Sequence, residues 1–167
     1  MIRIGRLAGF SAKELEKFLN AFELCKLVMS TEAFRFAVYQ STFSDTRLTG
    51  AYVYNYIMAA GLSVNFSIET PVFWKRWFSR EIAREVTGVG VIFNRSKYDS
   101  LDLPALAGVI FHECCHSANF NHTFWDTPQR NGSVPYKLGY LVEELARAMP
   151  AKNQVSEHLE ACQETNS

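Results

Sequence analysis

The sequence predicts a single α+β domain with a helical front half, a small sheet and a central helix that carries a histidine-rich motif. Apolar residues recur at helical spacing after residue 11, which indicates amphipathic helices. Residues 62–69 alternate between apolar and polar side chains, as a half-buried strand does. Three of the four histidines lie between positions 112 and 122. We expect residues 1–150 to form one domain and residues 151–167 to form a polar tail.

The composition suits one globular domain and excludes several partners. The 167 residues are 48% hydrophobic and 20% charged, which is enough to bury a core. The net charge is +0, so we expect no nucleic-acid partner. No apolar run is long enough to span a bilayer, and the first residues lack the apolar stretch of a signal peptide. With four unpatterned cysteines, these features favour a cytoplasmic protein without a membrane partner. The oligomeric state is not readable.

The front half predicts three helices. Ser11 and Glu14 have the spacing of a capping box, which opens the first helix. Residues 29–31 break the helical pattern and cap a second helix. A polar loop is expected over residues 41–50, and a third helix over residues 52–60.

The middle of the chain predicts the sheet. The strand at residues 62–69 is followed by a short helix that carries three aromatic side chains, Trp74, Trp77 and Phe78. Thr87 and Gly88 are expected to end a helical segment, and residues 89–93 read as a second strand. We expect residues 94–102 to form a polar loop.

The last part predicts two helices. Pro104 favours the first turn of the central helix, expected over residues 104–118. A loop over residues 123–133 precedes a helix at residues 138–149.

The central helix ends in the motif that points to function: His112-Glu113-Cys114-Cys115-His116-Ser117-Ala118-Asn119-Phe120-Asn121-His122. His112 and His116 are one helical turn apart, so both imidazoles leave the same face. Catalytic zinc sites use three protein ligands and keep one position open. His122 supplies a third ligand if the helix stops at Asn119, a residue type that tolerates positive φ.

These residues resemble the zincin signature H-E-x-x-H, and the longer spacing resembles the metzincin pattern H-E-x-x-H-x-x-G-x-x-H, with Asn119 in place of the glycine. The resemblance implies a minimal zincin-like domain that binds Zn²⁺ through three histidines. It also implies hydrolysis of a peptide or protein substrate by a zinc-activated water, with Glu113 as the general base.

Other third ligands remain open. Glu143 and Glu144 lie on the next helix, and Asp126 lies in the loop before it; zincins with a downstream Glu or Asp ligand are known. Cys115 is a more remote alternative, because it lies three residues after His112.

Two further expectations come from the metzincin resemblance. Metzincins place a methionine-containing turn beneath the metal, and here Ser133-Val134-Pro135-Tyr136 lacks the methionine. Tyr136 is nevertheless a candidate oxyanion donor. The strand at residues 89–93 is expected to pair with an extended substrate, with Gly90 allowing close approach.

Two rival functions use the same motif. One is a zinc-stabilised module without catalysis, in which Glu113 is incidental. The other is a zinc amidase acting on a non-peptide or cell-wall amide.

Overall fold

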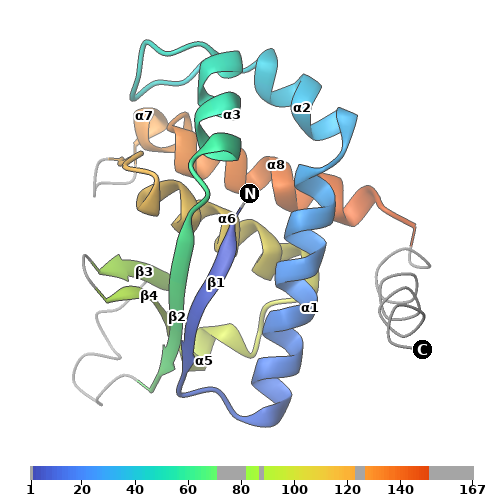
Figure 1. Ribbon diagram of the computed structural model, residues 1–167, viewed down its shortest axis with the longest axis vertical. Coiled ribbons are helices and arrows are strands. Elements are labelled where there is room, and N and C mark those ends of the chain that lie inside the picture. The colour runs from blue at the N-terminus through green and yellow to red at the C-terminus, as the bar shows by residue number, and fades with distance from the viewer. Residues whose placement is uncertain (1, 71–81, 87–88, 123–126, 151–167) are drawn as a thin grey trace.

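The structure is a computed structural model, and it describes residues 2–70, 82–86, 89–122 and 127–150. It is a mixed fold of helices around a small sheet (Figure 1). The elements in chain order are β1 (Arg3–Ala8), α1 (Ala12–Met29), α2 (Glu32–Tyr39), α3 (Gly50–Ala59), β2 (Ser63–Glu69), β3 (Ala83–Val86), β4 (Gly90–Asn94), α5 (Arg95–Tyr98), α6 (Leu103–Ser117), α7 (Pro128–Asn131) and α8 (Val134–Ala148). The α+β prediction is confirmed.

The four-stranded sheet has the order β1-β2-β4-β3. β1 pairs with β2 and β2 pairs with β4 in parallel, whereas β3 pairs with β4 in the antiparallel sense. β4 therefore has a neighbouring strand on each side and offers no free edge to a substrate. The expectation that this strand pairs with an extended substrate is wrong. Gly90 instead allows β4 to pack closely against β2. Its φ is 113°, and a Cβ at this position would lie 2.3 Å from the backbone oxygen of Asn65.

Helix α1 covers the sheet through aromatic packing. Phe18 on α1 contacts Phe66 on β2, with ring centroids 4.9 Å apart, and Phe93 on β4, with centroids 6.0 Å apart. All three rings are fully buried. Burying an aromatic side chain of this size contributes about 1.5–3 kcal/mol, so this cluster fixes α1 on the sheet.

Helices α6 and α8 cross closely because each carries a glycine at the contact. A Cβ on Gly108 of α6 would lie 2.7 Å from the carbonyl oxygen of Gly139 on α8. A Cβ on Gly139 would lie 3.0 Å from the carbonyl oxygen of Gly108. Figure 1 shows α8 running alongside α6. The crossing brings the α8 backbone to the helix that carries the histidine motif.

Most helix starts follow local sequence signals. Ser11 and Glu14 form the predicted capping box on α1, and Asp102 caps α6 by accepting a hydrogen bond from the Ala105 backbone N–H. α6 begins at Leu103 and ends at Ser117, close to the predicted 104–118. The predicted strand at residues 62–69 corresponds to β2.

Several boundaries differ from the predictions. Residues 83–86 form strand β3 and not the end of a helix, because pairing with β4 outweighs the helix preference of Ala83-Arg84-Glu85. The expected loops at 94–102 and 123–133 contain the short helices α5 and α7. The sequence pattern did not predict strand β1, because a register shift between Ile4 and Leu7 interrupts the alternation of its side chains.

Helix α8 begins at Val134, earlier than the expected residue 138. Ser133-Val134-Pro135-Tyr136 is therefore the first turn of a helix, and not an isolated turn. Pro135 fits there because the first turn of a helix leaves backbone N–H groups without helical partners.

Three predictions lie outside the described residues: the aromatic helix after Pro71, the side chain of Asp126 and the tail at 151–167. Within the described residues, no helix combines the length and apolarity needed to cross a bilayer.

Candidate metal centre

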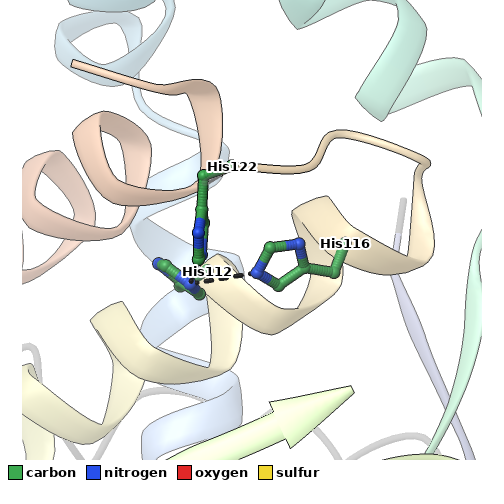
Figure 2. Close-up of side chains that lie close together, drawn as sticks. All are labelled: His112, His116 and His122. Atoms are coloured by element: carbon green, nitrogen blue, oxygen red, sulfur yellow. Dashed lines mark hydrogen bonds between the residues drawn. The ribbon is translucent and has the colours of Figure 1, made fainter. Parts of the chain in front are cut away.

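The structure brings His112, His116 and His122 together into one half-buried group that can hold a metal ion. His112 and His116 project from the last turns of α6, and His122 comes from the segment after the helix (Figure 2). The return of the chain depends on Asn119, which has φ 63°, as predicted. The backbone N–H of Phe120 donates to the carbonyl oxygen of Cys115, which closes this helix end.

Two of the separations between the ring nitrogens fit tetrahedral coordination. The Nε2 atom of His112 lies 3.2 Å from Nε2 of His116 and 3.3 Å from Nε2 of His122. Two imidazole nitrogens bound to one tetrahedral zinc at about 2.0–2.1 Å would be separated by about 3.3–3.4 Å. These two separations match this geometry, and all three ligand atoms lie within 4.8 Å of one another, so the group could hold a metal ion.

Hydrogen bonds to backbone oxygens orient two of the rings. Nδ1 of His116 donates to the carbonyl oxygen of Phe120 over 2.8 Å. His112 makes a hydrogen bond with the backbone of Pro135, which has only a carbonyl to offer. Because Nε2 of His112 faces the other two rings, Nδ1 is the nitrogen left for the Pro135 carbonyl. Both Nε2 atoms then carry lone pairs that face each other, an arrangement that a shared cation stabilises.

The surroundings favour neutral imidazoles, which are the metal-binding form. Burial, together with the neighbouring His116, His122 and Arg130, lowers the pKa of His112 to about 3. Burial and His122 also lower the pKa of His116. At neutral pH both rings are therefore uncharged, and their Nε2 lone pairs are available to a metal.

Glu113 is buried on α6 between the two helical ligands, with 5% of its surface exposed. Its neighbours Cys114 and Cys115 are also buried, as free thiols. Burial raises the pKa of both thiols well above the ordinary value, which keeps them protonated. Cys115 is not part of the metal-binding group among the described residues, which consists of the three histidines.

Tyr136 and Arg130 line the side of the group that faces α8. The Tyr136 ring centroid lies 4.5 Å from that of His112 and 4.7 Å from that of His122. The guanidinium carbon of Arg130, on α7, lies 4.6 Å from the Tyr136 centroid. The structure thus places the predicted Tyr136 beside two histidines. It also places Arg130 next to Tyr136, which the sequence did not indicate.

The loop between α2 and α3 fixes the start of α8. Both carboxylate oxygens of Asp45 accept from the Val134 backbone N–H, at 3.1 and 3.2 Å. The backbone N–H of Ser44 donates to the carbonyl oxygen of Gly132 over 3.0 Å. These contacts hold the turn of α8 that presents Pro135 and Tyr136 to His112.

The alternative ligands are not part of the metal-binding group among the described residues. Glu143 makes an ion pair with Arg147 over 2.7 Å on its own helix. Glu144 is exposed on α8. Asp126 lies outside the described residues. Within the described part of the chain, His122 is the third residue that joins His112 and His116.

Comparison with known proteins adds no relative. No family, no curated protein and no solved structure matches the chain. The three-histidine group is therefore the feature on which a functional assignment rests.

Proposed function

We propose that this protein is a zinc-dependent hydrolase of peptide amide bonds, in which His112, His116 and His122 hold the metal. The observation that carries the proposal is the convergence of their ring nitrogens, 3.2 and 3.3 Å apart, with backbone carbonyls fixing the orientation of two rings. Three histidine ligands leave a tetrahedral zinc with one open position, as catalytic sites require.

The metal, when bound, supplies Lewis-acid activation of water and of the substrate carbonyl group. Glu113 follows the first ligand directly, and in this proposal it accepts a proton from the attacking water and returns it to the leaving nitrogen. Tyr136, whose ring contacts His112 and His122, donates a hydrogen bond to the oxyanion of the tetrahedral intermediate. The chain's own residues thus provide ligands, a base and an oxyanion donor.

A second candidate is a zinc-stabilised module without catalysis. The burial of Glu113 favours this second function. A carboxylate that is only 5% exposed beside a bound zinc ion can stabilise the fold without taking part in catalysis. In this case the histidines tie the end of α6 to the segment after it, and folding depends on metal.

Replacing Glu113 with Gln distinguishes the two functions. The hydrolase proposal expects the variant to bind one zinc and to keep its unfolding temperature, while hydrolysis of a mixed peptide library falls at least about 100-fold. A variant that loses zinc or unfolds favours the module. Hydrolysis by the variant at the wild-type rate would overturn the role of Glu113.

The matched control is Glu144→Gln. This change removes the same charge from an exposed position on α8. We expect it to leave zinc content and hydrolysis unchanged.

A further inference from the structure

Arg130 is a cation next to a site that is itself suited to a cation. Its guanidinium lies over one face of Tyr136, whose ring also contacts His112. The positive charges of Arg130 and of a zinc ion repel each other in a half-buried site, where screening by water is incomplete. An anionic group bound between them relieves this repulsion.

No carboxylate of the protein pairs with Arg130 among the described residues. The Nε atom of Arg130 is buried, and it has no hydrogen-bond partner among the described residues. By contrast, Arg95 and Arg147 each bind carboxylates of the chain, namely Glu14, Asp102 and Glu143. Arg130 as a whole is half-buried, so a carboxylate ligand that reaches its guanidinium would supply the charged partner that the described residues do not provide.

The guanidinium is also preorganised. Contact with the Tyr136 ring restricts the side chain, and the Arg130 backbone is fixed at both ends. Its N–H donates to Thr127 Oγ1 over 3.2 Å, and its carbonyl oxygen accepts from Ser133 Oγ over 2.6 Å. A planar guanidinium held in this way is suited to bind a carboxylate, with two parallel hydrogen bonds as the preferred geometry.

We infer that Arg130 is a specificity residue that binds a carboxylate of the substrate close to the scissile amide. The inference rests on the proposed hydrolase function and adds the substrate class: peptides with either a free C-terminus or an acidic side chain next to the cleaved bond. Both sources present the same carboxylate, and the position of that charge in the probe distinguishes them.

The test uses peptide hydroxamates, which bind zinc without being hydrolysed. Three probes of equal length are compared on the zinc-loaded full-length protein by calorimetry. One ends in a free carboxylate, one ends in a carboxamide, and one ends in a carboxamide but carries Glu next to the hydroxamate. We expect one of the two acidic probes to bind the wild-type protein about tenfold more tightly than the neutral probe.

In Arg130→Gln we expect this preference to disappear while the affinity for the neutral probe stays the same. Arg130→Lys keeps the charge without the planar fork and should retain part of the preference. The matched control is Arg35→Gln, an exposed arginine paired with Glu32 on its own helix, which should keep the full preference. Thermal unfolding of each variant shows whether it is folded.

The outcomes separate the two proposals. If zinc-loaded wild-type protein binds all three probes equally, or if folded Arg130→Gln keeps the preference, the inference about Arg130 is overturned and the metal site stands. If the wild-type protein binds no zinc, the proposed function fails and the inference falls with it. If the preference holds but no peptide is hydrolysed, the proposed function fails, and the role of Arg130 in choosing a hydrolysed substrate fails with it, although Arg130 is then shown to bind a carboxylate.

Discussion

Gly139 on α8 lies directly against His112 on α6: a Cβ added to the glycine would stand 3.1 Å from the Cβ of the histidine. The close approach of the two helices thus coincides with a proposed metal ligand. It allows the Pro135 carbonyl, one turn earlier on α8, to accept a hydrogen bond from the His112 ring.

Replacing Gly139 with Ala should therefore weaken the metal site as well as the fold. The new methyl group meets the Gly108 carbonyl oxygen at 3.0 Å and pushes α8 away from α6. We expect a loss of about 1–3 kcal/mol in the free energy of unfolding. Displacement of Pro135 should lower zinc affinity at least about tenfold. Urea unfolding and zinc titration measure the two effects. Glu144→Ala, at an exposed position on α8, should change neither.

The identity of the third ligand can be tested by zinc content. We expect His122→Ala to lower zinc occupancy strongly, because it removes one of three converging nitrogens. Glu143→Ala should leave occupancy near that of the wild-type protein, since Glu143 is paired with Arg147. Metal analysis after dialysis against a weak chelator measures both. A greater loss in Glu143→Ala than in His122→Ala would reassign the ligand.

The helix end at Asn119 gives a prediction about backbone geometry. At φ 63° a residue with a plain Cβ is strained, whereas glycine is not. We expect Asn119→Ala to cost about 1 kcal/mol in unfolding free energy and to weaken zinc binding. Asn119→Gly should bind zinc as the wild-type protein does. Equal zinc affinity in the two variants would show that the metal site does not depend on this turn.

The pH dependence of stability should reflect Glu14. Hydrogen bonds from Ser11, with a further contribution from Arg95, lower the pKa of the Glu14 carboxyl from 4.5 to about 2. A carboxyl group with a lower pKa in the folded state stabilises the fold above its unfolded pKa. That contribution is lost as the pH falls from about 4.5 towards 2.

Glu14→Gln should accordingly lower the unfolding free energy at pH 7, by on the order of 2 kcal/mol after allowance for the solvent exposure of Arg95. The difference from the wild-type protein should shrink at pH 3. Urea unfolding at both pH values measures it. Glu23→Gln, which breaks a surface ion pair with Lys26, should have a small effect at either pH.

The parts of the fold that follow from local chemistry were predictable from the sequence. The Ser11 capping box, the alternation in β2 and the stop at Asn119 each depend on residues close together in the chain. The grouping of the three histidines followed from helical spacing plus that stop. Local preference was enough in these places because the short-range signals agree with the fold that forms.

The missed features depend on contacts between distant segments. Strand β3 exists because it pairs with β4, although its own residues favour a helix. Asp45 caps α8 from a loop far away in the sequence. Arg130 gave no signal, because its position beside Tyr136 depends on α7, which the sequence did not predict. No pattern within a short window encodes such pairings.

The most direct test of the metal centre is X-ray absorption at the zinc edge of the zinc-loaded protein. We predict one zinc per chain, bound by three imidazole nitrogens and one further light atom, all at about 2.0–2.2 Å. Absence of tightly bound zinc would contradict the account. A sulfur ligand at about 2.3 Å would also contradict it, because it would place a cysteine on the metal in place of a histidine.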